Sequence, residues 1–188
     1  IIALVDQAKD RRQAFADHYG AKAVFDSVED LFAQEVPDIV SAIVPVGQNR
    51  PIVLACAEAG VRVVSCEKPL AVELSHADEI VQTCRERGTL FGCGQSRWIT
   101  PYMPQVMDWI QAGNIGALTG ATIPAGLPVE VSGGGCVQLS ALRMVTGMDV
   151  AWVEGHTLEP IPRYVAYPDG PDVEKDCPAY GRVELTGG

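Results

Sequence analysis

Residues 61–70 have the sequence VRVVSCEKPL, in which a short apolar run is followed directly by two opposite charges. Residues 61–65 have the length and composition of a buried strand. Pro69 restricts Lys68 to an extended conformation and makes a cis peptide bond accessible. A lysine held there can stabilise a developing alkoxide or assist proton transfer. The competing interpretation is a surface turn in which Glu67 and Lys68 are simply solvated.

The same alternation of strand and helix extends outward from this stretch through the first half of the chain. Apolar runs predict strands at residues 1–5, 21–25, 38–44, 61–65 and 90–92. Amphipathic segments between them predict helices at residues 9–19, 27–33, 52–59 and 75–87, with Ser27 and Ser75 at two of the starts. Short connections between these elements are typical of a parallel sheet with helices on both faces and right-handed crossovers. The composition of residues 38–44 further predicts a strand that is buried on both faces.

Ligands in such sheets bind beyond the carboxyl ends of the strands. In this sequence those positions are Asp6, residues 45–49, residues 67–69 and residues 95–97. A carboxylate at Asp6 can accept hydrogen bonds from both hydroxyls of an adenosine ribose, and it would repel a 2′-phosphate, which favours NAD over NADP. Because Asp is also a good helix N-cap, a structural role for Asp6 fits the sequence equally well.

The pattern changes after Gly94, and we place a domain boundary near Trp98, between residues 1–97 and residues 98–188. The second part predicts helices at residues 102–111 and 137–145 and strands at residues 117–123, 150–154 and 182–185. A Gly/Pro-rich stretch and a polar loop are expected at residues 124–135 and 159–178. Backbone amides at residues 133–135, three glycines before a helix, can bind an anion, although a flexible loop has the same signature.

Charge and composition describe a globular chain of 188 residues with an acidic balance. Its 24 acidic and 14 basic residues give a net charge of -10, which disfavours nucleic acid as a partner. No apolar run approaches the ~20 residues needed to cross a bilayer, so no membrane partner is expected. No basic-led signal peptide is present, and the chain lacks an initiator Met, so it need not begin at a natural start.

Six cysteines are present: Cys56, Cys66, Cys84, Cys93, Cys136 and Cys177. None forms a C-x-x-C pair, so neither a zinc site nor a thioredoxin-like motif is expected, and no metal is predicted. Several lie in apolar contexts, and we interpret them as reduced core residues. Reduced thiols predict a cytoplasmic location.

Together these residues resemble the Gfo/Idh/MocA family, named after glucose–fructose oxidoreductase and inositol dehydrogenase. The segment AGVRVVSCEKPLA at residues 59–71 is similar to its most diagnostic motif, which opens with A-G and closes with E-K-P-L-A. Residues 94–98, GQSRW, resemble its next landmark, a strand end followed by an Arg and an aromatic residue. Residues 110–116, IQAGNIG, resemble its helix-to-sheet junction. The resemblance is good to about residue 123, loose over residues 133–155 and faint beyond.

The resemblance implies a Rossmann-like domain followed by an α/β domain with an open, mostly antiparallel sheet. It implies NAD(P) as cofactor, a sugar, polyol or related hydroxy compound as substrate, and a homo-oligomer formed through the second domain. Lys68 would be the catalytic lysine beside the hydride-transfer centre. Asp6 would hold the adenosine ribose, and Glu67 would lie near the nicotinamide side. The full set of cofactor-binding residues would be Asp6, Pro45, Glu67, Pro69 and Arg97.

Departures from the family pattern bear on function. The first strand and its G-x-G-x-x-G turn are absent, so we expect an incomplete sheet and weak dinucleotide binding, because that turn seats the pyrophosphate. The chain also ends before several strands of the family pattern. The family's His and Asp on the helix after the Gly-rich segment fall on Val137 and Ser140, and neither residue shuttles a proton as His does. Near Pro45, a frequent Asn–His pair is replaced by Val46-Gly47.

Three functional hypotheses follow. The leading one is an NAD(P)-dependent oxidoreductase acting on a sugar-like or polyol substrate, with Lys68 at the reaction centre. Its rival is a non-catalytic ligand sensor or regulatory protein on the same fold, which the absent His and Asp favour. The third is a hydrolase or isomerase that uses bound NAD transiently. Fold alone does not name the substrate.

Overall fold

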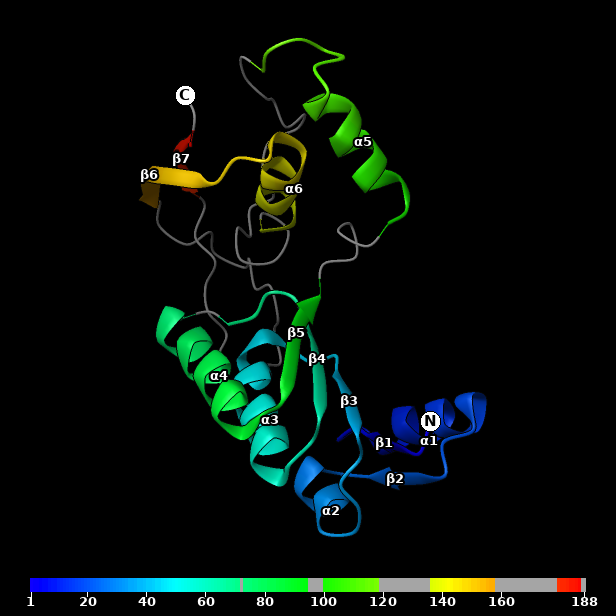
Figure 1. Cartoon of the computed structure of the whole chain (residues 1–188). Helices are drawn as coiled ribbons and strands as arrows, with labels where there is room; N and C mark the ends of the chain where they lie inside the picture. Colours follow the sequence, from blue (N-terminus) through cyan, green and yellow to red (C-terminus); the bar gives the residue numbers. More distant parts are fainter. Residues whose placement is uncertain (72, 95–99, 119–135, 158–178, 187–188) are drawn as a thin grey trace. The chain divides into compact units, whose positions relative to one another are not determined.

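The computed structural model describes residues 1–71, 73–94, 100–118, 136–157 and 179–186 (Figure 1). The chain divides into two compact units, Ile1–Gly94 and Gln95–Gly188, and each is described by itself. The division falls close to the boundary that we place near Trp98, and the assignment of two domains stays a prediction.

The first unit alternates strands and helices as the sequence predicts. Its elements are β1 (Ala3–Val5), α1 (Lys9–Tyr19), β2 (Ala23–Phe25), α2 (Val28–Phe32), β3 (Ile39–Ala42), α3 (Val46–Ala59), β4 (Val63–Glu67), α4 (Leu74–Arg87) and β5 (Leu90–Gly94). β3, β4 and β5 form a parallel sheet in that order, and β1 pairs in parallel with β2 in a second sheet. Within the described residues no strand joins the two sheets. The expected Rossmann-like parallel sheet is therefore present and incomplete.

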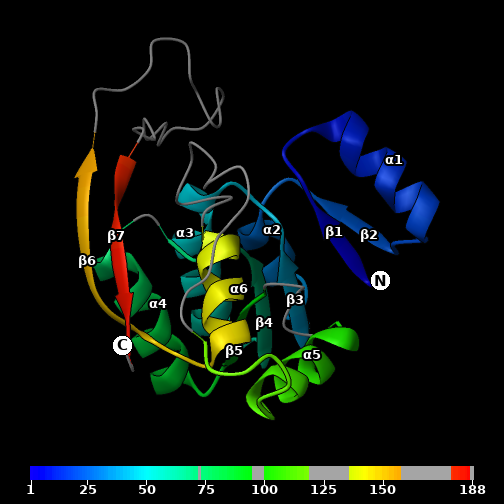
Figure 2. The ribbon, with the colours of Figure 1, turned by 90° about the horizontal axis from the view of Figure 1, so that it is seen from above.

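The core of the first unit lies between the three-stranded sheet and two helices. Because β3, β4 and β5 follow one another in the sheet, crossovers of the same hand place α3 and α4 on one face. Both views of the ribbon show these helices side by side against the sheet (Figures 1 and 2). Val53 of α3, Val64 of β4 and Ile80 of α4 are each 0% exposed. Burying one such side chain contributes about 1.5–3 kcal/mol.

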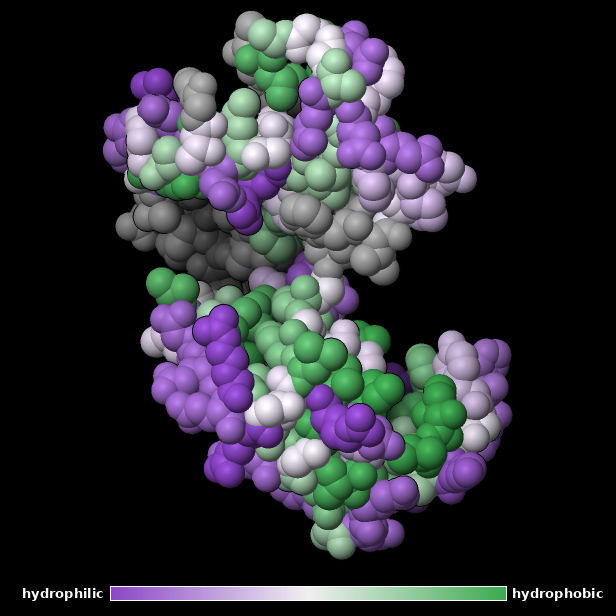
Figure 3. Space-filling view, in the orientation of Figure 1, coloured by the Kyte–Doolittle hydropathy of each residue, from purple (hydrophilic) through white to green (hydrophobic). Residues whose placement is uncertain are grey.

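The prediction that residues 38–44 are buried on both faces is wrong for the described part of the chain. Ala42 is 5% exposed, whereas Ile39 and Ile43 are 68% and 77% exposed. Side chains alternate between the faces of a strand, and α3 and α4 cover one face only. Hydrophobic surface is accordingly visible over this part of the first unit (Figure 3). The sequence predicts helices on both faces of the sheet. A second layer that covers the other face of β3, β4 and β5 is not found among the described residues.

Helix boundaries follow the local sequence closely at several positions. Ser27 caps α2 as predicted, and its side chain accepts a hydrogen bond at 3.1 Å from the amide three residues on. α4 begins at Leu74, next to the predicted Ser75. Gly60 ends α3 with a φ of 88°, a left-handed conformation that other residues rarely adopt. This turn directs the chain into β4.

The second unit contains α5 (Tyr102–Gln111), α6 (Cys136–Thr146) and a pair of antiparallel strands, β6 (Val150–Thr157) and β7 (Ala179–Leu185). The sequence predicts both helices and both strands, and the paired strands are longer than predicted, with a register shift between Val150 and Trp152. The strand expected at residues 117–123 lies mostly outside the described residues, and Ala117 and Leu118 are not in a strand. The glycines at residues 133–135 and the loop expected at residues 159–178 also lie outside them. The small antiparallel sheet agrees with the expected fold class.

Ile80→Ala should destabilise the first unit by about 2–5 kcal/mol, because it leaves a cavity in a close-packed core. Urea unfolding followed by the circular dichroism of the helices would measure the change. Leu74→Ala is the matched control on the same helix, since its side chain is 77% exposed. The control should change stability by less than about 0.5 kcal/mol. Equal losses in the two variants would contradict the assigned core.

Candidate functional site

The Glu67-Lys68-Pro69 turn lies at the carboxyl end of β4, the central strand of the three-stranded sheet. β4 ends with Glu67, which pairs in register with Gly94 of β5. The Lys68–Pro69 peptide bond is cis, the isomer that the sequence makes accessible. The turn thus occupies the edge at which open parallel sheets bind their ligands.

A single buried side chain, Asn49 of α3, holds this turn. Its Nδ2 lies 2.8 Å from the carbonyl oxygen of Pro69, 3.1 Å from that of Glu67 and 3.3 Å from that of Leu70. Asn49 is 1% exposed, and its three hydrogen bonds are part-buried. Each such hydrogen bond contributes about 0.5–1.5 kcal/mol. The Asn49 amide therefore fixes the backbone that carries Lys68.

The amide reaches the turn because α3 begins directly after Pro45 rather than at residue 52, where the sequence predicts its start. Pro51 is the reason for that error, because a proline lacks the amide that continues a helical ladder. The helix nevertheless continues through Pro51, which removes one backbone hydrogen bond. Contacts made by the residues before the proline hold this first part of α3 in place.

One of those contacts is an ion pair between α3 and α4. Arg50 Nε lies 2.6 Å from Glu79 Oε2, and Arg50 Nη2 lies 3.0 Å from Oε1, so the pair is bidentate. These hydrogen bonds lower the pKa of Glu79 and raise the pKa of Arg50. The first turns of α3, and with them Asn49, are thereby tied to α4.

Lys68 and Glu67 form a loose charge pair. The Lys68 ammonium lies 4.0 Å from Glu67 Oε1, which is too far for a hydrogen bond. Their side chains are 35% and 46% exposed, so solvent screens the attraction. An ammonium with three donors in this position can bond an incoming substrate oxygen. It can then stabilise negative charge on that oxygen or give it a proton.

Asp6, directly after β1, has donors on both carboxylate oxygens. Oδ1 accepts hydrogen bonds from the Ala8 amide and from Arg11 Nη2, both at 2.8 Å, and Oδ2 accepts one from Arg11 Nε at 2.6 Å. The Arg11 hydrogen bond lowers the pKa of Asp6, so the carboxylate is ionised at neutral pH. Asp6 is not the N-cap that the sequence allows, because Ala8 holds that position, but its carboxylate bonds the Ala8 amide just before α1. A carboxylate has about four lone-pair sites, so the three hydrogen bonds leave one on Oδ2 for a ribose hydroxyl.

The structure brings some of the predicted residues together. Glu67, Lys68 and Pro69 share one turn, and Pro45 directly precedes the helix whose Asn49 binds that turn. Asn49 belongs to residues 45–49, which the sequence places after a strand end. No local sequence pattern predicts a role for this residue.

Two predicted residues do not join this group. Asp6 belongs to the β1–β2 sheet, which within the described residues is not paired with β3. Arg97 lies outside the described residues.

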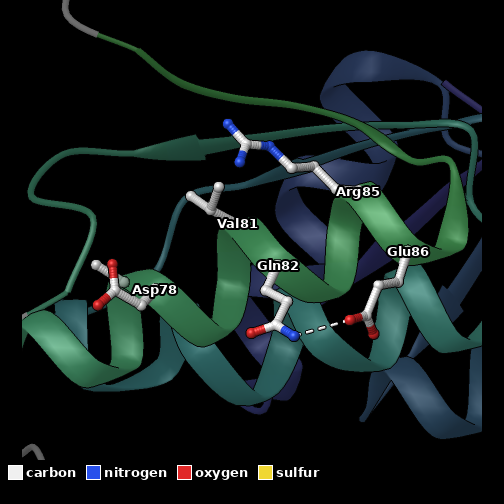
Figure 4. A pocket seen from close by; sticks show the side chains of 6 residues that line it. Asp78, Val81, Gln82, Arg85 and Glu86 are labelled. Carbon is white, nitrogen blue, oxygen red and sulfur yellow. Dashed lines mark hydrogen bonds between the residues drawn. The ribbon is translucent and has the colours of Figure 1, made fainter.

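A surface hollow over α4 does not include the residues of this turn. It is lined by Ala77, Asp78, Val81, Gln82, Arg85 and Glu86 (Figure 4). Two of its polar groups bond each other, since Gln82 Nε2 donates to Glu86 Oε1 at 2.8 Å. Across the described ranges, no group of His, Cys, Asp and Glu side chains could hold a metal ion, and no helix is long and apolar enough to cross a bilayer. The Glu67-Lys68-Pro69 turn is therefore the candidate functional site.

A family comparison agrees with this geometry. Residues 1–95 match the model of the oxidoreductase family with an NAD-binding Rossmann fold that bears the name GFO_IDH_MocA. The chain belongs to the Gfo/Idh/MocA family. The match covers both parallel sheets and the turn that carries Lys68.

Individual relatives agree with the family assignment. The chain is 33% identical over 88 residues to D-glucoside 3-dehydrogenase of Escherichia coli (strain K12), over 47% of this chain and 25% of the relative. It is 27% identical over 149 residues to trans-1,2-dihydrobenzene-1,2-diol dehydrogenase of Mus musculus, over 74% and 44% of the two chains. An oxidoreductase from Agrobacterium radiobacter, solved with NAD+, L-tartaric acid and magnesium, has a TM-score of 0.71 and 25% identity over 86% of this chain and 51% of that one. The chain thus spans about half or less of each relative's length.

Asn49→Ala should loosen the Glu67–Leu70 turn, because three carbonyls of the turn lose the Asn49 donor. We expect faster backbone amide exchange at Lys68 and Leu70 and a stability loss of about 1–3 kcal/mol. Asn114→Ala is the matched control, since that exposed amide donates to one carbonyl, that of Trp109, at 2.7 Å. Unchanged exchange at the turn in a folded Asn49→Ala protein would show that the amide does not hold it.

Proposed function

We propose that the protein containing this chain is an NAD(P)-dependent dehydrogenase or reductase acting on a sugar, polyol or related hydroxy compound. The observation that carries the proposal is Lys68, on a turn fixed by a buried amide at the carboxyl edge of the parallel sheet. Family membership supports the cofactor class. The names of relatives support the substrate class, among them D-glucoside 3-dehydrogenase and the myo-inositol 2-dehydrogenase of Thermotoga maritima, which is 22% identical over 116 residues (62% of this chain and 34% of the relative).

The proposed chemistry centres on one oxygen of the substrate. A nicotinamide, when bound, would accept or supply the hydride. Lys68 donates an N–H to the substrate oxygen, which stabilises the negative charge that develops there when a carbonyl carbon gains hydride and its C=O π bond opens. The same ammonium then gives a proton to that oxygen. In the opposite direction the Lys68 amine takes the O–H proton of the alcohol as the C–H bond breaks. Such acid–base assistance is typically about 10²–10⁴-fold in rate. Glu67 keeps a compensating charge 4.0 Å away.

The residues that would hold the cofactor are Asp6, Pro45, Glu67, Pro69 and Arg97. Asp6 fits this role chemically, because its ionised carboxylate keeps one acceptor site on Oδ2 for a ribose hydroxyl, and displacement of Arg11 would free the sites for the second. We place the ribose there, which favours NAD over NADP. Arg11 partly offsets the negative charge of Asp6, so discrimination against a 2′-phosphate depends on this pair.

A second candidate is a reaction without net oxidation. One relative, 32% identical over 94 residues that make up 50% of this chain and 24% of the relative, is the 2,7-anhydro-N-acetylneuraminate hydratase of Mediterraneibacter gnavus. Such a protein would turn over substrate without accumulating NADH. A ligand sensor is the remaining alternative, because α6 contains no histidine to act as acid or base.

The wider setting is proposed on the same basis. We expect a small-molecule substrate as partner rather than nucleic acid, given the net charge of -10. Assembly through the second unit, the 97/98 domain boundary and a cytoplasmic location stay predictions.

Lys68→Met in the protein containing this chain should lower kcat for hydride transfer by about 10²–10⁴-fold, because the substrate oxygen loses its donor. Stopped-flow absorbance of NADH with a panel of polyols and aldoses would measure it. Lys22→Met, which alters an exposed lysine of the same unit, is the control and should leave kcat unchanged. A ligand sensor would instead show no turnover in the unaltered protein and an intact ligand response in Lys68→Met.

Asp6→Ser should weaken NADH binding and strengthen NADPH binding, because it removes the ribose acceptor and leaves Arg11 for a 2′-phosphate. A lost hydrogen bond to a charged group is worth about 1.5–3 kcal/mol, so we expect at least a roughly tenfold change in the ratio of the two Kd values. Calorimetric titration of both nucleotides would give that ratio. Asp17→Ser, on the exposed face of α1, should leave it unchanged. An unaltered ratio in Asp6→Ser would remove Asp6 from the cofactor site.

A further inference from the structure

The core of the first unit contains four thiols that the proposed chemistry does not use. Cys56 of α3, Cys66 of β4 and Cys84 of α4 are buried, and Cys93 of β5 packs against the same hydrophobic cluster. Burial raises the pKa of Cys56 to about 12 and raises the pKa of Cys84. Cys56 and Cys84 are therefore inert core residues, as the sequence analysis expects of all six cysteines.

Cys66 and Cys93 differ from the other two because they face each other directly. They are register partners in the parallel β4–β5 pair, so their side chains point to the same face of the sheet. Neighbouring strands lie about 4.8 Å apart, inside the range of Cα separations found in disulfides. This pair therefore requires little backbone movement to become covalently linked.

The two members of the pair have different reactivities. The hydrogen bond from Cys66 stabilises a thiolate at Cys93 and lowers the pKa of Cys93, against the opposing effects of burial and of Glu67. The same bond, together with burial, raises the pKa of Cys66. Cys93 is also partly exposed, whereas Cys66 is 2% exposed. Cys93 is thus the accessible nucleophile, and Cys66 is the neighbour that can react with it next.

The pair also touches the candidate functional site. Cys93 Sγ lies 3.7 Å from the carbonyl oxygen of Glu67, and it donates to that oxygen. Asn49 Nδ2 donates to the same oxygen at 3.1 Å. A change in the position of Cys93 Sγ therefore alters a hydrogen bond of the turn that carries Lys68.

We propose that Cys66 and Cys93 are an oxidant-sensitive thiol pair, which a hydroperoxide converts to a disulfide that disturbs the Glu67-Lys68-Pro69 turn. The Cys93 thiolate attacks the hydroperoxide, the O–O bond breaks, and the leaving oxygen departs as water or an alcohol after taking a proton. Cys93 becomes a sulfenic acid. The Cys66 sulfur then attacks the Cys93 sulfur, the S–O bond breaks, and hydroxide leaves as water with the Cys66 proton. The two thiols lose two electrons, and the hydroperoxide gains them.

The cross-link can be mapped in the reduced protein containing this chain after treatment with hydrogen peroxide. Cleavage after glutamates is required, because Glu67 and Glu79 then separate the peptides of Cys66 and Cys84, and Glu86 separates Cys84 from Cys93. We expect a peptide pair linking Cys66 to Cys93 under non-reducing conditions, and its loss after dithiothreitol. The absence of this pair, or equal yields of other cysteine pairs, would overturn the proposal.

Variants assign the order of the two steps. Cys93→Ser should abolish the cross-link and the peroxide response, and this partly exposed position should tolerate the change. Cys66→Ser, whose hydroxyl can still donate to Cys93, should leave a sulfenic acid on Cys93 that dimedone traps. Cys136→Ser, in the second unit, should behave as the unaltered protein. Dimedone labelling of Cys66 instead of Cys93 would contradict the proposed order.

The effect on the turn can be read without any catalytic assay. Backbone amide exchange at Lys68 and Leu70 should rise in the oxidised protein, return after reduction and stay constant in Cys93→Ser. Unchanged exchange in the cross-linked protein would contradict the coupling. Only a fall in NADH-linked turnover on oxidation rests on the proposed function, so a protein without that activity would not affect the mapping or the exchange result.

Discussion

The arrangement of the candidate site depends on one requirement, that the partly buried carbonyls of the Glu67–Leu70 turn find a hydrogen-bond donor. Backbone groups that leave a sheet ladder must be paired elsewhere wherever water does not reach them. Pro69 contributes no amide of its own, and the amide of Asn49, 1% exposed, supplies the donor. Three features therefore act together to fix where Lys68 lies. They are the start of α3, the ion pair between α3 and α4, and the course of the chain after β4.

This constraint marks how far the sequence alone could predict the site. The alternation of apolar runs and amphipathic segments predicted every strand and helix of the first unit and the parallel sheet, because side-chain periodicity is a local property. The role of Asn49 could not be predicted, because its acceptors lie 18, 20 and 21 residues away and no local pattern marks it. The predicted start of α3, after Pro51, was wrong for the same reason. Tertiary contacts outweighed the local helix-breaking signal of the proline.

Two further differences have physical causes of the same kind. The apolar composition of residues 38–44 indicates that they prefer burial, but it does not say which neighbours provide it, and the described helices cover the Ala42 side while Ile39 stays 68% exposed. At Asp6 the sequence allowed a cap or a ribose ligand as alternatives. The structure gives the cap position to Ala8 and instead binds the Asp6 carboxylate to the Ala8 amide and to Arg11, which leaves one acceptor site on Oδ2.

In the first unit, Arg11 and Arg50 are held differently from Lys68. Arg11 and Arg50 are bound in bidentate pairs with Asp6 and Glu79, with shortest N–O distances of 2.6 Å. A planar guanidinium suits such fixed structural pairing, whereas an ammonium is a mobile point charge that can give up a proton. At the end of β4 the cation is the lysine, and its 4.0 Å separation from Glu67 is a charge contact without a hydrogen bond. The backbone of the turn is held by Asn49 while its cation is held loosely, and this combination fits the role that we propose for Lys68.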